Sequence, residues 1–213
     1  MKFSPNKQTR LIGIFALLFA AVFATGLLVK YSPWASAGSQ NGIAAQAAQN
    51  GDGENQFIGE MPILELELDS GTVVIQLRPD LAPEHVARII ELSEQGFYDG
   101  LVFHRVIEGF MAQTGDPTGT GMGGSELPDL NAEFTNEVSF QRGVLGMARS
   151  ANPNSANSQF FIVFGDASFL DGNYTIFGQV IEGMEFVDNI RKGDPRSGQM
   201  DNPDKIISMR LRK

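Results

Sequence analysis

The sequence of 213 residues contains no cysteine and only two histidines. Without cysteine there is no disulfide scaffold, no iron–sulfur cluster and no thiol nucleophile, and two histidines are too few for the usual zinc sites. We therefore expect neither a metal nor a cofactor, and any chemistry must come from other side chains. Disorder throughout the chain is also excluded, because 42% of the residues are hydrophobic and 16 are phenylalanine, which is enough to bury a core.

Acidic residues are missing from the first part of the chain. Residues 1–37 carry only basic charges, and all 25 acidic residues follow them. With 16 lysines and arginines in total, the whole chain has a net charge of −9. Binding the phosphates of a nucleic acid requires clustered lysine and arginine. The acidic composition after residue 37 therefore argues against nucleic acid as a partner.

An uncharged apolar run occupies residues 11–29, close to the ~20 residues that cross a bilayer as a helix. The basic residues before it would keep the N-terminus in the cytoplasm and send the rest of the chain across the membrane. We predict a basic tail and a signal anchor over residues 1–37, with the transmembrane helix at 11–29. The alternative is a signal peptide cleaved after Ala37, because Ala35-Ser36-Ala37 has the small residues of such sites.

Residues 38–60 are rich in glycine, alanine, glutamine and asparagine and contain almost no large apolar residue. Such a segment cannot bury enough apolar surface to fold alone. We therefore predict a flexible spacer over 38–60 and a single folded domain over 61–213.

Alternating apolar residues dominate the start of this domain. Leu64, Leu66 and Leu68 alternate with acidic residues, and a second alternating run follows Gly71, which predicts an antiparallel hairpin. An amphipathic helix is expected over 83–92, with proline in its first turn. Further strands are expected at 102–107, 110–114, 144–148, 159–164, 175–180 and 206–211, and a second helix at 182–192. Many short strands with two helices indicate an all-β antiparallel barrel or sandwich, and closure into a barrel would leave no exposed edge.

The segment Gly119–Gly124 fits the dinucleotide-binding pattern G-x-G-x-x-G. That pattern requires a following apolar helix, whereas polar residues and Pro128 follow here. We interpret the segment as a tightly turning surface loop. A structural role is also expected for the histidines and for three loop serines, because they lack the neighbours of a nucleophile or a metal site: His85, His104, Ser150, Ser155 and Ser158.

The segment 102–113 carries the most informative pattern of the chain. In a strand, Met111 and Gln113 share one face while Phe110 and Ala112 face the other side, and Arg105 would come from the neighbouring strand of the same hairpin. A guanidinium beside these side chains fits a groove that binds an apolar group and donates hydrogen bonds to a carbonyl or amide. The alternative is that Phe110 and Met111 are core residues and Arg105 is a surface charge.

Three blocks of this sequence together resemble the cyclophilins, the cyclosporin-binding family of peptidyl-prolyl cis-trans isomerases. They are FHRVI with GFMAQ (103–107 and 109–113), GVLGMA (143–148), and SQFFI with FLDG (158–162 and 169–172). The resemblance runs from about residue 62 to 213. It implies an eight-stranded antiparallel closed β-barrel capped by two α-helices, in agreement with the strands and helices expected above.

The resemblance also implies the residues of the site. Arg105 would be the central catalytic residue and Gln113 would orient the substrate. The substrate-binding residues would be Phe110, Met111, Ala148, Arg149, Ala151, Phe161, Phe169, Leu170 and Tyr174. Tyr174 stands where many members have histidine, and Phe169 where cyclosporin-sensitive members have tryptophan. Loss of the indole N–H donor predicts that cyclosporin binding is weakened.

The resemblance implies proline-containing polypeptides as partners and a monomeric enzyme without a cofactor. With the N-terminal segment, it predicts an isomerase that assists folding outside the cytoplasm, anchored in the membrane with its catalytic domain in the periplasm. The domain would be free in the periplasm if the chain were cleaved after Ala37. The alternative function is a chaperone module that binds proline peptides with little or no turnover.

Overall fold

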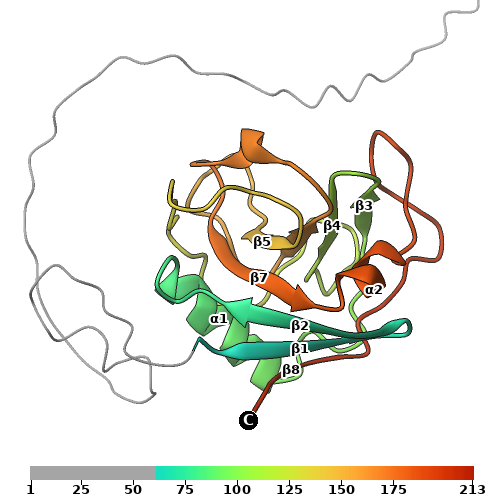
Figure 1. Ribbon diagram of the computed structural model, residues 1–213, viewed down its shortest axis with the longest axis horizontal. Helices are drawn as coiled ribbons and strands as arrows, with labels where there is room; N and C mark the ends of the chain where they lie inside the picture. Colours follow the sequence, from blue (N-terminus) through green and yellow to red (C-terminus); the bar gives the residue numbers. More distant parts are fainter. Residues whose placement is uncertain (1–60) are drawn as a thin grey trace, which may run out of the picture. The chain divides into compact units, whose positions relative to one another are not determined.

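The computed structural model describes residues 61–213, and Figure 1 shows their arrangement. The predicted anchor and spacer lie outside the described residues. Within 61–213, none of the helices is both long enough and apolar enough to cross a membrane. The elements in chain order are β1 (Ile63–Leu68), β2 (Gly71–Leu77), α1 (Pro83–Glu94), β3 (Arg105–Ile107), β4 (Met111–Thr114), β5 (Val144–Met147), β6 (Phe160–Val163), the 3₁₀ helix η2 (Ser168–Leu170), β7 (Ile176–Glu182), α2 (Met184–Asp188) and β8 (Ser208–Leu211).

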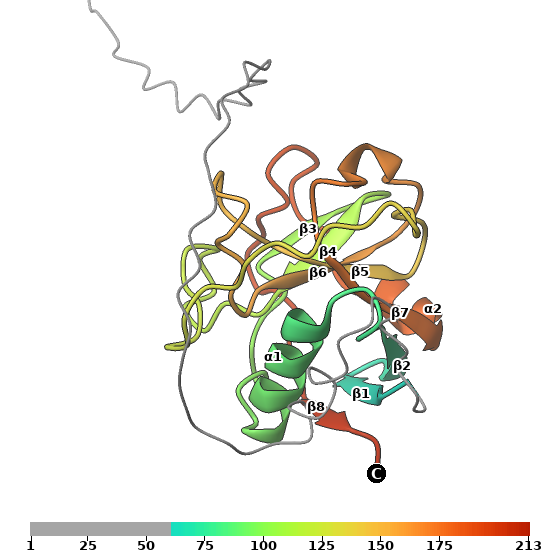
Figure 2. The ribbon, with the colours of Figure 1, turned by 90° about the vertical axis from the view of Figure 1, so that its left-hand side faces the viewer.

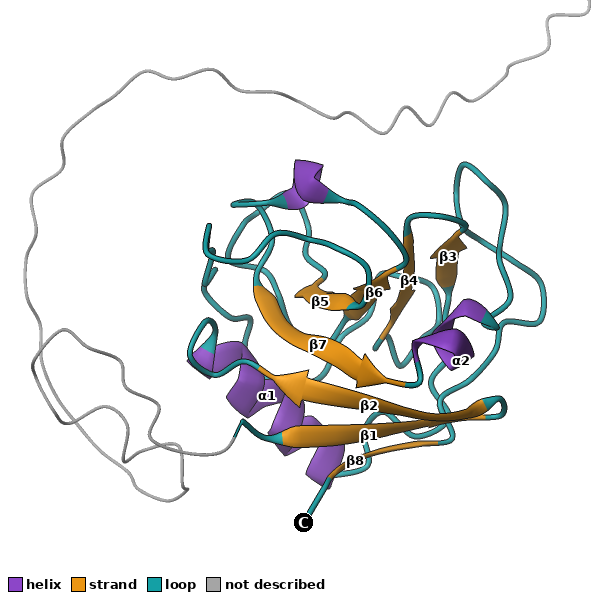
Figure 3. Ribbon diagram, viewed as in Figure 1, coloured by secondary structure: helices purple, strands orange, loops and turns teal. Residues whose placement is uncertain are grey.

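The eight strands form one antiparallel sheet in the order β3-β4-β6-β5-β7-β2-β1-β8. Figure 3 shows that the sheet curls, with β5, β6 and β4 above β7, β2 and β1. Helix α1 packs beside β8 and β7, and α2 packs beside β2 (Figure 2). The predicted eight antiparallel strands and two helices are therefore confirmed.

The strand ladder itself does not close into a barrel among the described residues, because β3 and β8 are the two ends of the sheet. Irregular backbone bridges the gap instead. The Phe103 N–H donates to the Asp204 carbonyl at 2.9 Å, and the Ile206 N–H donates to the Leu101 carbonyl at 2.9 Å. The structure is thus a curled sheet whose seam is crossed by loop hydrogen bonds, and it does not show the closed barrel expected from the sequence.

The first hairpin follows the alternation of its side chains. Leu64 and Leu66 are fully buried, and the register pairs Leu68 with Gly71 across a two-residue turn. Gly71 is required there, because its φ is +144° and a Cβ atom would lie 2.6 Å from the ring of Phe186. The turn glycine therefore lets α2 pack closely against the hairpin.

Helix α2 is shorter than the predicted helix over 182–192. Glu182 belongs to β7, and Gly183 separates strand from helix with a left-handed φ of +80°. A left-handed residue cannot continue an α-helix. The segment that was predicted to be one helix therefore contains the end of β7 and the short helix α2.

The interior contains two groups of buried apolar side chains. The main core lies inside the curled sheet and under α1, and it includes Phe160 and Phe177. The second group, here called the pocket cluster, comprises Met111, Phe140, Val144, Phe161, Val163, Ala167, Leu170 and Ile176. Successive residues of a strand point to opposite faces, so β6 sends Phe160 into the main core and Phe161 into the pocket cluster. The sheet thus supports a second apolar site on its other face.

Candidate active site

The β3–β4 hairpin brings Arg105, Met111 and Gln113 together as the sequence predicts. Its register pairs Arg105 with Gln113, and Ile107 with Met111. Arg105 Nη1 donates to Gln113 Oε1 at 3.3 Å and lies 3.8 Å from Met111 Sδ. The guanidinium is therefore held over the β4 residues that border the pocket cluster.

Phe110 does not lie on the face where strand alternation places it. Strand β4 begins only at Met111, and Phe110 belongs to a turn in which its N–H donates to the Ile107 carbonyl at 3.0 Å. Gly109 permits this turn with a φ of +71°. As a result Phe110 packs against the pocket cluster together with Met111, while Ala112 enters the main core. The prediction that Phe110 and Ala112 share a face is therefore wrong, because the period of two does not hold in a turn.

Aromatic rings pack in and around the pocket cluster. Phe161 is 5% exposed, stacks on Phe140 at 5.7 Å between ring centroids, and meets the edge of Tyr174 at 5.8 Å. At the rim, Phe169 is 69% exposed and its ring lies 5.4 Å from that of Phe110. An exposed aromatic ring beside a buried apolar floor is a surface on which a small apolar group can be bound.

The stacking of Phe161 on Phe140 depends on a glycine in β5. A Cβ atom at Gly146 would lie 2.5 Å from Phe161 Cζ and 2.6 Å from Phe140 Cε1. Both distances are below van der Waals contact. Gly146 therefore allows the two rings to stack against the backbone of β5.

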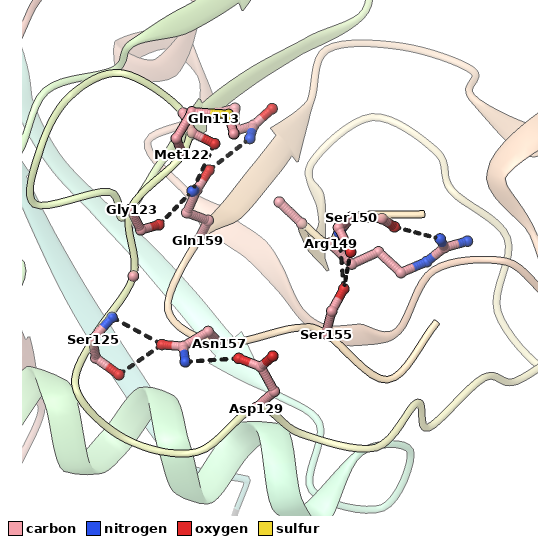
Figure 4. Close-up of a pocket in the computed structure, with 13 residues that line it drawn as sticks. Gln113, Met122, Gly123, Ser125, Asp129, Arg149, Ser150, Ser155, Asn157 and Gln159 are labelled. Atoms are coloured by element: carbon pink, nitrogen blue, oxygen red, sulfur yellow. Dashed lines mark hydrogen bonds between the residues drawn. The ribbon is translucent and has the colours of Figure 1, made fainter. Parts of the chain in front are cut away.

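A groove of about 540 Å³ lies beside the pocket and is lined by residues from several segments. Figure 4 shows Gln113, Met122 and Gln159 on one side of it and Arg149 on another. Ala148 also lines the groove, whereas the exposed Ala151 does not. The structure thus brings together all the predicted site residues except Ala151 at the pocket or at this groove.

Arg149 reaches away from Arg105 and stacks on an aromatic ring. Its guanidinium carbon lies 4.6 Å from the centroid of the Tyr174 ring, and its Nη2 donates to the Asn173 carbonyl at 2.7 Å. These contacts hold the side chain of Arg149, which is among the residues that line the groove.

Gln159 is a site residue that the sequence reasoning missed. It accepts a hydrogen bond from Gln113 Nε2 at 2.9 Å and donates through Nε2 to the carbonyls of Gly121 and Gly123 at 3.1 and 2.7 Å (Figure 4). A continuous chain of hydrogen bonds therefore links Arg105, Gln113 and Gln159 to the glycine loop. Gln159 precedes β6, which begins at Phe160, so strand alternation does not assign it to a face.

The loop at 119–124 is held by one buried carboxylate. Asp116 is 1% exposed and accepts hydrogen bonds from the backbone N–H groups of Thr118, Thr120 and Gly121 at 2.7, 3.1 and 2.6 Å. Burial acts to raise the pKa of Asp116, but the hydrogen bonds outweigh it and lower the pKa to about 2. A carboxylate that stays ionised gathers the loop into the predicted tight turn, and no apolar helix follows it within the described residues.

The two histidines are both buried, His85 in α1 and His104 next to the glycine loop. His85 Nδ1 lies 2.6 Å from Glu133 Oε2, which accounts for its burial at the start of α1. Burial lowers the pKa of His104, and nearby Asp116 opposes this effect. His104 lies beneath Gly121, where a Cβ atom would be 3.5 Å from its ring. Both positions agree with the structural role expected from the sequence.

The electrostatics of the site centre on Arg105. Burial lowers the pKa of Arg105, and Tyr174 opposes this effect. Guanidinium starts from so high a pKa that it remains charged in a protein. A partly desolvated cation makes stronger hydrogen bonds than one in bulk water.

The structure is a curled antiparallel sheet with two helices, in which a partly buried arginine lies beside an apolar cluster and a groove. The family model of the cyclophilin type peptidyl-prolyl cis-trans isomerases matches residues 63–211. The chain accordingly belongs to the cyclophilin family of peptidyl-prolyl cis-trans isomerases.

Relatives and solved structures agree with this membership. A probable peptidyl-prolyl cis-trans isomerase of Brucella suis is 52% identical over 176 residues, covering 77% of this chain and 86% of the relative. The crystal structure of a cyclophilin type isomerase from Cryptosporidium parvum is 30% identical with a TM-score of 0.66, covering 72% of this chain and 98% of that one. A cyclophilin from Hirschia baltica is 27% identical with a TM-score of 0.63, covering 71% and 74%. The activity class of this chain is therefore that of an isomerase.

Proposed function

We propose that Arg105 is the residue that accelerates rotation about X–Pro bonds in this isomerase. The observation that carries the proposal is the arrangement of its guanidinium. Nε donates to the Ser197 carbonyl and Nη1 donates to Gln113, while Nη2 makes no hydrogen bond within residues 61–213. A fixed cation with one unused donor group at the edge of an apolar pocket is suited to donate to a bound peptide.

The chemistry requires stabilisation of a twisted peptide bond and no bond cleavage. Resonance in the C–N bond sets a barrier of about 18–20 kcal/mol to rotation. In the twisted state the prolyl nitrogen loses conjugation and becomes a better hydrogen-bond acceptor. A donor from Arg105 aimed at this nitrogen therefore gains strength mainly in the transition state, which is the condition for a faster rate.

The other site residues would hold the two sides of the rotating bond. Phe110, Met111, Phe161 and Leu170 would enclose the proline ring, because all four contribute to the pocket or pack against it. Gln113 would orient the substrate beside Arg105. The Cryptosporidium parvum cyclophilin has been solved in the presence of the dipeptide Ala-Pro, and we propose proline-containing polypeptides as the substrates here. The decisive experiment measures cis-to-trans isomerisation of a short X–Pro peptide by the wild type and by Arg105→Ala.

The proposed setting of this activity is the periplasm, where the enzyme would assist protein folding while tethered by the predicted helix at 11–29. The support is the basic flank and uncharged apolar run of the sequence. We expect cell fractionation to recover the domain outside the cytoplasm in the membrane fraction. A soluble form that starts at Gly38 would contradict the anchor but keep export, and a cytoplasmic chain would contradict both.

Weak cyclosporin binding is proposed from the residue at position 169. Replacing Phe169 by tryptophan is expected to raise cyclosporin affinity about 2- to 10-fold, because the indole N–H adds one donor worth about 0.5–1.5 kcal/mol. The 69% exposure of Phe169 leaves room for the larger ring. Calorimetric titration of both proteins tests this, with Phe169→Leu as a control that removes the ring and adds no donor. Equal or weaker binding by Phe169→Trp than by the wild type would contradict the assignment.

A further inference from the structure

The outer edge of β3 is covered by a loop from a distant part of the sequence. The Gly193 N–H donates to the Val106 carbonyl at 2.9 Å, and the Val106 N–H donates to the Gly198 carbonyl at 2.9 Å. The loop after α2 lies beside β3 in the views of Figure 1 and Figure 2. Residues 193–199 thus occupy the place of a missing neighbour strand for β3, and we call them the edge loop.

The edge loop is shaped by its own side chains and backbone. Asp194 Oδ1 accepts hydrogen bonds from the N–H groups of Arg196 and Ser197 at 2.9 and 2.8 Å and from the Ser197 hydroxyl at 3.1 Å. The Gly198 N–H donates to the Asp194 carbonyl at 2.7 Å. These bonds fix the direction of the Ser197 carbonyl without any contribution from the groove.

This loop contacts Arg105 at both its polar end and its aliphatic stem. The Ser197 carbonyl accepts a hydrogen bond from Arg105 Nε at 3.2 Å. At Gly198, an added Cβ atom would lie 2.8 Å from Arg105 Cγ and 2.9 Å from Ile107 Cγ1. The side chain of Arg105 therefore rests directly on the glycine backbone, with no room for a larger residue.

Two anchors from different segments determine the plane of the guanidinium. Ser197 holds Nε from the edge loop, and Gln113 holds Nη1 from β4. A planar group fixed at two of its nitrogens has a fixed direction for the third, which is Nη2. Reacting groups that are misplaced by about 1 Å can lose about 10²-fold in rate.

We propose that the edge loop is a positioning element for isomerisation, in which Asp194, Ser197 and Gly198 aim Arg105 at the substrate without touching it. This inference rests on the role of Arg105 given under the proposed function. It assigns a contribution to rate to residues that line neither the pocket nor the groove. The loop acts on the turnover step, because the apolar pocket that binds the proline ring is formed by other elements.

The primary test compares two glycine substitutions in the full chain. Gly198 and Gly100 have the same φ of +76°, but a Cβ atom at Gly100 meets nothing within 4 Å. Gly198→Ala is expected to lower kcat about 10- to 100-fold with KM changed less than about 3-fold. Gly100→Ala carries the same backbone strain, and its kcat is expected to stay within about 2-fold of the wild type. Equal losses in the two variants would overturn the proposal.

The Arg105→Ala background separates positioning of Arg105 from general damage. Residues that act through one group show non-additive effects, so adding Gly198→Ala to Arg105→Ala is expected to cause no further loss of kcat. A further 10-fold loss in that background would show that the glycine acts independently of Arg105. If Arg105→Ala alone keeps full turnover, the proposed function fails. If Arg105→Ala is inactive and Gly198→Ala is fully active, only the edge-loop inference fails.

A second pair of variants covers the case in which Gly198→Ala does not fold. Asp194→Ala removes the acceptor that shapes the loop, whereas Asp194→Asn keeps an oxygen at that position. We expect kcat to fall about 3- to 10-fold in Asp194→Ala and to be largely restored in Asp194→Asn. The Arg105 Nε–H resonance, observed by NMR, is expected to shift in Asp194→Ala and to stay near its wild-type position in Asp194→Asn. An unshifted resonance and unchanged kcat in Asp194→Ala would overturn the proposal.

Discussion

Replacing Arg105 by alanine is expected to lower kcat/KM for an X–Pro peptide about 10²- to 10³-fold, the loss typical of removing one donor aimed at a transition state. The fold should survive, because Arg105 is only partly buried and its backbone pairing in β3 does not depend on its side chain. The loss should fall mainly on kcat, since the apolar side chains that are proposed to bind the proline ring remain. Stopped-flow or protease-coupled measurement of isomerisation provides the rate constants, and circular dichroism checks the fold.

Two further arginine variants make the Arg105 experiment specific. Arg142 is a surface arginine paired with Asp188 at 2.6 Å, and Arg142→Ala should leave turnover unchanged. Arg105→Lys keeps the charge but loses the planar fork, so we expect an intermediate rate. Full activity of Arg105→Ala would refute its catalytic role. A folded wild type that binds proline peptides without turnover would instead favour the chaperone module that the sequence left as the alternative.

The second large effect is expected from the neighbouring phenylalanines of β6. Phe160→Ala and Phe161→Ala should each lower the free energy of unfolding by about 3–5 kcal/mol, because both rings are buried, at 0% and 5% exposure. Only Phe161→Ala should also impair catalysis, with kcat/KM lowered about 10- to 100-fold by loss of the pocket floor. Urea unfolding measures the first effect, and peptide isomerisation at low temperature, where both variants are folded, measures the second.

Phe160 is a matched control because it lies next to Phe161 and points to the opposite face. It packs in the main core against Tyr98 and Phe177, at 5.6 and 5.9 Å between ring centroids. A comparable loss of kcat/KM in both variants would show that catalysis follows stability alone. That result would contradict the assignment of Phe161 to the proline pocket.

The sequence predicts those parts of the fold in which the spacing of apolar residues reflects a single strand or helix. Leu64, Leu66 and Leu68 alternate because one face of β1 is buried, and Val86 and Ile89 recur with the period of a helix. The pairing of β3 with β4 is also a local feature, since a short hairpin turn joins the two strands and places Arg105 opposite Gln113. Local pattern indicated Arg105, Met111 and Gln113, whereas residues such as Phe161 and Leu170 were implied only by the resemblance to the cyclophilins.

The parts that sequence reasoning missed depend on turns or on distant segments. Phe110 departs from alternation because Gly109 forms a turn, and α2 begins only at Met184 because Gly183 is left-handed. Gln159 contacts Gln113, 46 residues away, and the carbonyls of the glycine loop, 36 and 38 residues away in sequence. Backbone carbonyls carry no residue signature, so no pattern of side chains could have indicated the contacts with the glycine loop.

The seam between β3 and β8 also determines when the site can exist during synthesis. Ser197 contacts Arg105 across 92 residues of chain, and β1 pairs with β8, the last strand of the sheet. Contacts of such long range form slowly, because the loop entropy is lost before the contacts are gained. A nascent chain that lacks this C-terminal part therefore has neither the β1–β8 pairing nor the Ser197 contact that holds Arg105. The site of a given copy is therefore complete only after the C-terminal part of its own chain is available to fold.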